Sequence, residues 1–126
     1  MFTHVMLGSN DMAASQAFYD ALFAALGASP AVRDEKGRLI YLHGGAMFMV
    51  TTPIDGQPDC HANGGTVGFA MTSAGQADAW HAAGVAAGGA TCEDPPGLRD
   101  SPVGPLYLAY LRDPAGNKLC GVYRPA

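Results

Sequence analysis

The sequence contains few charged residues and no excess of positive charge. Charged residues make up 14% of its 126 residues, and 7 Lys and Arg against 11 Asp and Glu give a net charge of −4. Nucleic acids bind proteins largely through basic surfaces, which pair with the phosphates. We therefore expect no nucleic-acid partner.

Long apolar segments and paired cysteines are also lacking. No apolar run approaches the roughly 20 residues of a membrane-spanning helix, and the opening MFTHVMLGSND does not place an apolar segment behind a basic one, as a secretory signal does. Cys60, Cys92 and Cys120 are odd in number, widely spaced and form no CxxC pair. This usage suits reduced thiols rather than a disulfide framework. We expect a cytoplasmic protein with no membrane partner.

An internal repeat is the most informative feature that the sequence does contain. Residues 4–28 align without a gap with residues 66–90, at an offset of 62 residues, and the alignment pairs Val5 with Val67. In each copy a short apolar segment is followed by a helical pattern. The repeat predicts two matched strand–helix units.

Capping residues mark the ends of both predicted helices. One of the polar residues 9–11 can accept a hydrogen bond from the first helical turn, and Ser73 with Gln76 forms a capping-box pattern before the second helix. Gly27 can adopt the left-handed conformation that ends the first helix. Trp80 falls on the face of the second helix that should pack on a sheet, so we expect it in the core.

Strand patterns follow each predicted helix. We expect strands over 29–33, 39–43 and 47–51 in the first half, and over 90–92, 106–112 and 118–123 in the second, with 93–105 as a loop. Each half therefore reads β-α-β-β-β, and residues 52–64 connect the halves. A doubly wound parallel fold is disfavoured, because helices do not alternate with every strand.

The order of these elements and several short sequence motifs resemble the vicinal oxygen chelate superfamily, which includes glyoxalase I, bleomycin-resistance proteins and extradiol dioxygenases. The resemblance rests on the first strand with His4, the phrases Asn10-Asp11-Met12 and Ala17-Phe18-Tyr19, and the closing RDPAGNKL at 112–119. It implies an α+β fold of two βαβββ modules with pseudo-two-fold symmetry, whose curled mixed sheets surround an open cleft. One domain would span 1–126, with module one at about 1–52 and module two at about 65–126.

The resemblance also implies positions for a metal site. Metal-using members place four side chains in the cleft, one from the first and one from the last strand of each module. The matching positions here are His4, Phe48 or Met49, Thr66 and Cys120, where the family typically has His or Gln and Glu. A divalent ion needs about three protein donors, and these residues offer too few. We therefore expect no cofactor and no tight metal, with a divalent ion as the minor alternative.

Other side chains are candidates for lining the cleft. Arg99 lies in a Gly- and Pro-rich segment near the expected cleft mouth, where it could bind a carboxylate or a phosphate, or could simply be solvated. Tyr107 and Tyr110 face opposite sides of one strand, so at most one lines the cleft; we assign Tyr107. Phe48 and Met49 would form a soft apolar wall, unless they only fill the core.

The resemblance leaves three functions open. The first is a small-molecule-binding member without a tight catalytic metal, akin to bleomycin-resistance proteins. The second is a metal-dependent lyase, isomerase or dioxygenase whose ligands come from other positions, and the third is a partner-binding protein whose cleft is filled. Edge strands left unpaired in two small sheets favour a homodimer.

Overall fold

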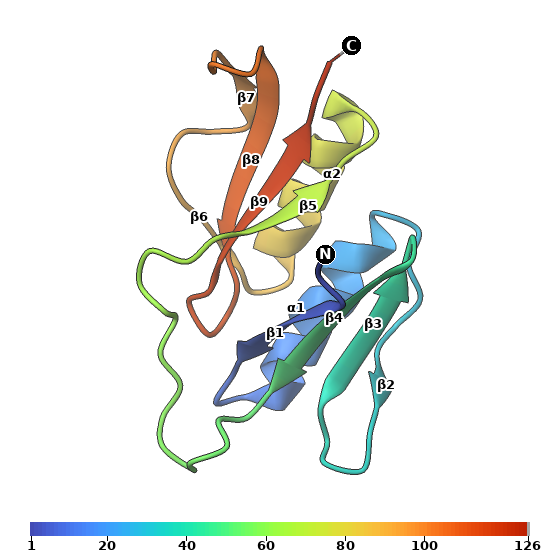
Figure 1. The fold of residues 1–126 in the computed structure, drawn as a ribbon, viewed down its shortest axis with the longest axis vertical. Coiled ribbons are helices and arrows are strands. Elements are labelled where there is room, and N and C mark those ends of the chain that lie inside the picture. Colours follow the sequence, from blue (N-terminus) through green and yellow to red (C-terminus); the bar gives the residue numbers. More distant parts are fainter. Residues whose placement is uncertain (126) are drawn as a thin grey trace.

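The computed structural model describes residues 1–125 as two sheets, each backed by a helix (Figure 1). The first sheet has the order β1-β4-β3-β2, with β1 parallel to β4 and β3 antiparallel to it. Its elements are β1 (His4–Gly8), α1 (Met12–Ala24), β2 (Val32–Arg33), β3 (Leu39–His43) and β4 (Ala46–Thr51). The first half is thus a βαβββ module.

The second sheet repeats this topology. Its order is β5-β9-β8-β6, with β5 parallel to β9, and β7 also pairs with β8. Its elements are β5 (Val67–Ala70), α2 (Ala74–Ala86), β6 (Ala90–Thr91), β7 (Gly97–Arg99), β8 (Leu106–Arg112) and β9 (Lys118–Tyr123). The expected α+β fold of two βαβββ modules is confirmed. The prediction that 93–105 is all loop is wrong, because residues 97–99 pair with β8.

The register shows that the two modules are equivalent. Val5 lies opposite Phe48 in the parallel pair β1 and β4, and Val67 lies opposite Leu119 in the parallel pair β5 and β9. In each module the first strand therefore pairs with the last. The offset of 62 residues places Val5 and Val67 on matching strands.

Local capping explains where the helices begin. Asp11 is the N-cap of α1 and accepts a hydrogen bond from the backbone N–H of Ala14 over 3.0 Å. Ser73 caps α2 by accepting from the Gln76 N–H over 3.0 Å, while the Gln76 side chain accepts from the N–H of Thr72. These contacts satisfy backbone donors that a helix start leaves free.

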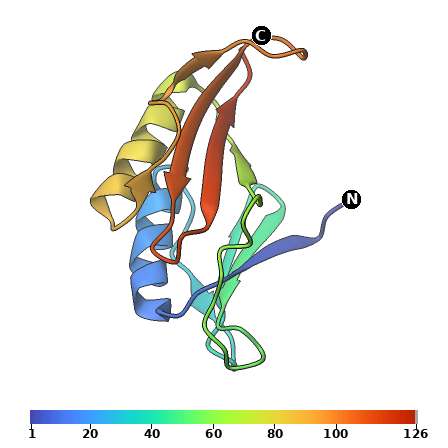
Figure 2. The same cartoon turned by 90° about the vertical axis from the view of Figure 1, so that its left-hand side faces the viewer.

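Both helices lie on the same side of the sheets (Figure 2). The core between helices and sheets is continuous across the modules, because Phe69 of β5 lies 5.5 Å, ring centre to ring centre, from Phe48 of β4. Trp80 of α2 is fully buried and packs 6.1 Å from Phe69, as expected for a core residue. Within residues 1–125, no helix has the length and apolar character to cross a membrane.

Candidate functional site

Strand alternation gives the first sheet two distinct faces. Val5, Tyr41 and Phe48 belong to the core beneath α1. His4 and Met49, one position away in the same strands, therefore face the opposite side. Of the two positions considered on the last strand of this module, Met49 shares a face with His4, and Phe48 points toward the helix.

His4 and Met49 differ in their surroundings. His4 is exposed, and its Nδ1 lies 2.9 Å from the hydroxyl of Thr3. Met49 is only 7% exposed, although it lies on the face away from α1. The imidazole is accessible, whereas the thioether beside it is a buried, soft donor that suits few divalent ions.

The second sheet places Cys120 beside Tyr110. These residues lie directly opposite each other in β9 and β8, so their side chains share one face. Tyr107 lies on the other face, and its hydroxyl donates a 2.6 Å hydrogen bond to Asp78 of α2. The tyrosine that accompanies Cys120 is therefore Tyr110, and the assigned Tyr107 points toward the helix.

Burial dominates the electrostatics around Cys120. It raises the pKa of the Cys120 thiol, and the hydrogen bond from Tyr110 only partly opposes this effect. Lys118 forms an ion pair with Glu93, and its Nζ lies 5.0 Å from the centre of the Tyr110 ring. Because metals bind the thiolate rather than the thiol, Cys120 is a weak ligand at neutral pH.

Arg99 lies in β7 rather than in a loop. It pairs with Leu106 of β8, which puts its side chain on the same sheet face as Tyr110 and Cys120. Its guanidinium donates to the carbonyl of Pro95 over 2.6 Å and forms no ion pair within residues 1–125. Two backbone carbonyls, those of Pro95 and Leu98, occupy part of its donor set.

The four family metal positions do not form a donor set for a divalent ion. His4 supplies one nitrogen, Cys120 a buried thiol and Met49 a thioether. Thr66, exposed just before β5, supplies a weak hydroxyl donor. Across residues 1–125, His, Cys, Asp and Glu form no group of three or more that could hold a metal ion. The residues present therefore do not fit the metal that the superfamily implies.

A groove of about 330 Å³ lies instead between the first sheet, the end of α1 and β5. We call it the inter-sheet groove. It is lined by Val5, Phe23, Leu26, Ala28, Tyr41, His43, Gly44, Ala46, Met47, Phe48, Val67, Gly68, Phe69 and Ala70. Of the seven side chains proposed from the sequence, only Phe48 lines it. His4, Met49, Thr66, Arg99, Tyr107 and Cys120 lie elsewhere.

Aromatic rings form one wall of the inter-sheet groove. Phe23 lies 5.4 Å from Phe48 and 5.4 Å from Phe69, measured between ring centres. The Tyr41 ring lies 4.9 Å from Phe23, and its hydroxyl donates to Asp20 over 2.7 Å. Burial, and then this hydrogen bond, raise the pKa of Tyr41 far above its usual value, so the phenol stays neutral.

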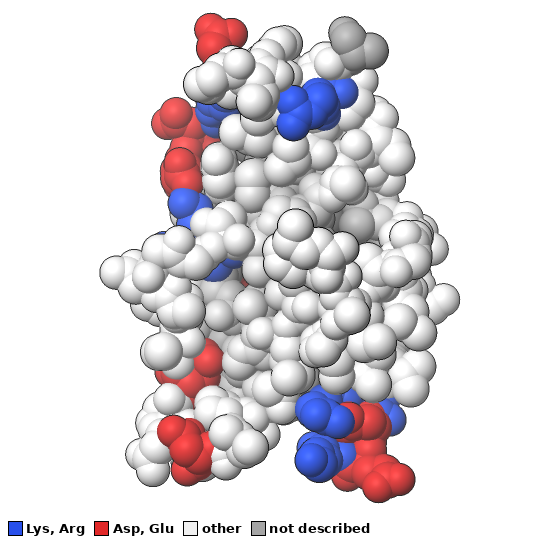
Figure 3. All heavy atoms as spheres, viewed as in Figure 1, with Lys and Arg blue, Asp and Glu red and all other residues white. Residues whose placement is uncertain are grey.

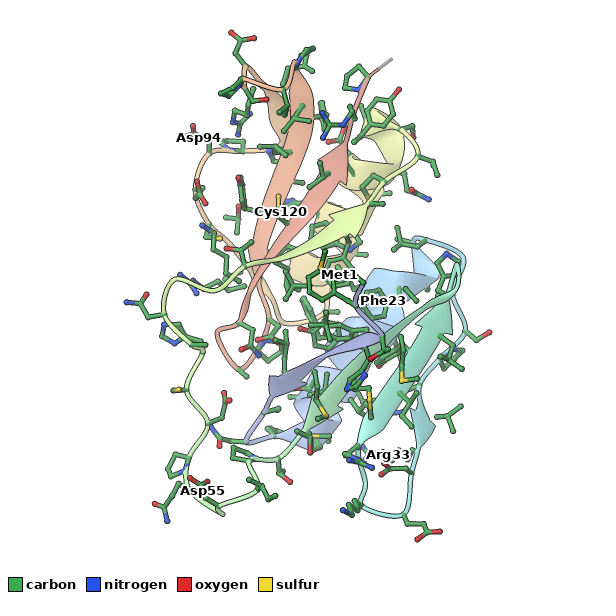
Figure 4. The ribbon with its side chains drawn as sticks, viewed as in Figure 1. Met1, Phe23, Arg33, Asp55, Asp94 and Cys120 are labelled. Carbon is green, nitrogen blue, oxygen red and sulfur yellow. The ribbon has the colours of Figure 1, made fainter. Side chains whose placement is uncertain are left out.

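Sequence reasoning missed Phe23 and Phe69 as groove residues. Both lie on apolar stripes that predict only burial, and they come from different modules. Nothing local indicates that a helix end and the first strand of the other module meet (Figure 4, where Phe23 is labelled). The one available signal was the repeat itself, which implied that two modules have to pack together.

Comparison with solved structures gives close and distant matches. A glyoxalase/bleomycin resistance protein from Albidiferax ferrireducens T118 is 56% identical, with a TM-score of 0.94, over 98% of this chain and 99% of that chain. A glyoxalase-related enzyme from Fulvimarina pelagi matches over 99% and 89% of the chains, with 20% identity and a TM-score of 0.73. A glyoxalase/bleomycin resistance protein/dioxygenase family enzyme from Burkholderia phytofirmans PsJN is 17% identical over 96% of both chains, with a TM-score of 0.73.

The two distant matches show a shared fold alone. The match at 56% identity covers nearly the whole chain and carries the family relationship. No protein-family model matches the sequence, and no curated protein matches it either.

Proposed function

The chain belongs to the glyoxalase/bleomycin resistance protein family within the vicinal oxygen chelate superfamily, and from this premise we propose that it binds a small molecule in the inter-sheet groove without a resident metal ion. The observation that carries the proposal is the groove itself. Its volume of about 330 Å³ lies within the size range of small-molecule sites, which are concave and mostly apolar.

The poor donor set at the family metal positions supports metal-independent binding. His4 and Cys120 are the only strong donor types among the four, and burial keeps Cys120 protonated. Two donors leave at least two coordination positions to water. The binding function therefore depends on shape and apolar contact rather than on Lewis-acid chemistry.

We also propose that the protein is a homodimer. β1 and β5 are edge strands, each hydrogen-bonded on one side only within residues 1–125. The first sheet exposes Leu42 at 67% and Met6 at 41%. Edge strands and apolar sheet faces of this kind are usually covered by a partner. Sedimentation equilibrium tests this assembly, and a single monomeric species at micromolar concentration contradicts it.

A reducing cytosol is the compartment that we propose for the chain. Cys60 is exposed, Cys92 is partly buried and Cys120 is buried, and all three are free thiols. Free thiols persist where glutathione and thioredoxin keep them reduced.

A neutral fluorescent dye, N-phenyl-1-naphthylamine, tests binding in the inter-sheet groove. We expect saturable binding, seen as an increase in dye fluorescence. Ala46 is exposed at the groove rim, so Ala46→Trp should fill the groove and weaken dye binding at least about ten-fold, a loss of about 1.4 kcal/mol. Ala86→Trp, at an exposed position at the end of α2, is the matched control and should bind like the wild type.

The result that contradicts the proposal is equally specific. If the dye does not bind the wild type, or binds both variants equally, the inter-sheet groove is not the ligand site. Circular dichroism of both variants checks that each retains its fold.

A further inference from the structure

We infer that the inter-sheet groove selects an uncharged, flat aromatic molecule of two or three fused rings and discriminates against ions of either sign. This inference rests on the proposed small-molecule function and names the class of ligand. It follows from the charge, shape and size of the groove lining.

Charge is the first argument. The fourteen lining residues include no Asp, Glu, Lys or Arg. Tyr41 stays neutral, and its hydroxyl is already engaged with Asp20. An ion that entered the groove would lose hydration and would contact no Asp, Glu, Lys or Arg among the lining side chains, which is costly for either sign. Figure 3, viewed as in Figure 1, shows mostly uncharged residues over the middle of the molecule and charged side chains toward its ends and edges.

Shape is the second argument. The Phe23 and Phe48 rings meet at an interplanar angle of 79°, and the Phe48 and Phe69 rings meet at 66°. Phe23 and Phe48 are only 5% and 7% exposed, and the parts of the three rings that line the groove belong to planes at steep angles to one another. A flat aromatic ligand can make offset-stacked or edge-to-face contacts with such a wall, at centre distances of about 4.5–7 Å. A saturated chain has no ring face or edge with which to use this geometry.

Size sets the number of rings. An engineered apolar cavity of about 150 Å³ holds one benzene ring. The inter-sheet groove, at about 330 Å³, is roughly twice as large. Two fused rings fill most of this space, and a third ring reaches the open side.

The groove mouth allows one polar substituent. His43 ends β3, and Gly44 follows it in the turn to β4. The His43 side chain is exposed, and an imidazole can donate or accept a hydrogen bond. The other polar lining side chain is Tyr41, whose hydroxyl proton is already donated to Asp20. A single hydroxyl or carbonyl at one end of the ligand would therefore lie at the mouth, with the rings inside.

Three probes with the same ring system test the charge preference. These are 2-naphthol, 2-naphthoate and 2-(aminomethyl)naphthalene, which are neutral, anionic and cationic at pH 7. Isothermal titration of the wild type should give a dissociation constant for 2-naphthol at least about ten-fold lower than for either ion. Ala46→Trp should weaken 2-naphthol binding by a similar factor.

Ala46→Asp should shift the preference toward the cationic probe if the inference is right. It places a carboxylate at the exposed rim without touching the core, so the cationic probe should gain several-fold in affinity and the anionic probe should lose. His43→Gln keeps a hydrogen-bonding group at the mouth and should retain most 2-naphthol affinity, whereas His43→Ala should lose several-fold.

The outcomes separate this inference from the proposed function. If an ionic probe binds the wild type as tightly as 2-naphthol does, and Ala46→Trp blocks it, the groove is a ligand site and the charge inference is overturned. If no naphthalene probe binds and N-phenyl-1-naphthylamine also fails, the proposed function and the inference fall together. If the dye binds in the groove and 2-naphthol does not, the proposed function stands and the inferred place for a hydroxyl at the groove mouth is overturned.

Discussion

The Tyr19 hydroxyl donates a 2.6 Å hydrogen bond to Oδ2 of Asp113, which joins α1 of the first module to the turn before the last strand of the second. Both residues are buried, with Tyr19 at 0% and Asp113 at 4% exposure. Asp113 also accepts from the backbone N–H and the side-chain amide of Asn117, and that amide donates to the carbonyl of Gly8 as well. This buried polar network connects the two halves of the chain.

Tyr19→Phe should destabilise the protein by about 1–3 kcal/mol, because it removes a donor from a buried carboxylate. Burial, followed by the Asp113 charge, raises the pKa of Tyr19 well above its usual value, so the donor is present at every accessible pH. Tyr107→Phe is the matched control: it also loses a 2.6 Å hydrogen bond to an aspartate, but at an exposed site where water can replace it. Urea denaturation measures both, and equal losses would contradict the prediction.

Gly89→Ala should destabilise the protein by about 1–3 kcal/mol through overpacking. A Cβ at this position would lie 2.4 Å from the Phe18 ring and 2.9 Å from the backbone oxygens of Arg112 and Gly84, none of which can move aside easily. Gly75→Ala, in the first turn of α2, meets nothing closer than 3.8 Å. It should be neutral or stabilise by up to about 1 kcal/mol, since Ala favours helix over Gly. The unfolding temperature should fall for Gly89→Ala and should stay level or rise for Gly75→Ala.

Asp59→Asn should stabilise the protein at pH 7 but not at pH 3. Burial, and then the Asp113 carboxylate, raise the pKa of Asp59, against an opposing effect of His61. Its Oδ2 is buried without a hydrogen-bond partner among the described residues. The folded state therefore holds this proton to a higher pH than the unfolded state, and wild-type stability falls as pH rises above the ordinary aspartate value of about 3.9. Asp59→Asn has no carboxyl group at this position, so its stability does not fall in this way as the pH rises.

Asp34→Asn is the control for Asp59→Asn, because the pKa of Asp34 is lowered whereas that of Asp59 is raised. Desolvation acts against ionisation of Asp34, but hydrogen bonds from the Arg38 side chain and backbone outweigh it and lower the pKa of Asp34. At a pH above the ordinary aspartate pKa, the ionised Asp34 carboxylate therefore adds to the stability of the wild type. This added stability is lost as the pH falls through the lowered pKa of Asp34. Denaturation midpoints from pH 3 to 7 should diverge in opposite directions for the two variants. A parallel trend would contradict the assigned pKa shifts.

Removal of divalent metal should leave the thermal stability of the protein unchanged. Protein purified without a histidine tag should contain well under one equivalent of divalent metal, and dialysis against EDTA should not shift its unfolding temperature. The reason is the donor set of His4, Met49, Thr66 and Cys120, which offers at most two effective ligands. One equivalent of metal that survives dialysis and is lost in His4→Ala would instead support a metal-dependent lyase, isomerase or dioxygenase.

Much of the fold could be predicted because the relevant signals are local. The capping signals at residues 9–11 and at Ser73, and Gly27 after the first helix, act within a few residues of where they stand. The repeat then implied that whatever the first half forms, the second half forms again. The short strand β7 was missed, because Pro95 and Pro96 precede it, Gly97 is its first residue, and its pairing depends on β8.

The sequence by itself determined the two modules and, within each strand, which side chains share a face of the sheet. Both follow from local backbone preferences and from the two-residue period with which side chains alternate along a strand. It did not determine which face of a strand meets a helix. Only the tertiary structure decided that Phe48 and Tyr107 point toward helices while Met49 and Tyr110 point away. The inter-sheet groove also arises only in the tertiary structure. Phe23 and Phe69 become neighbours only when the two modules, which are separate in sequence, bury their apolar faces together.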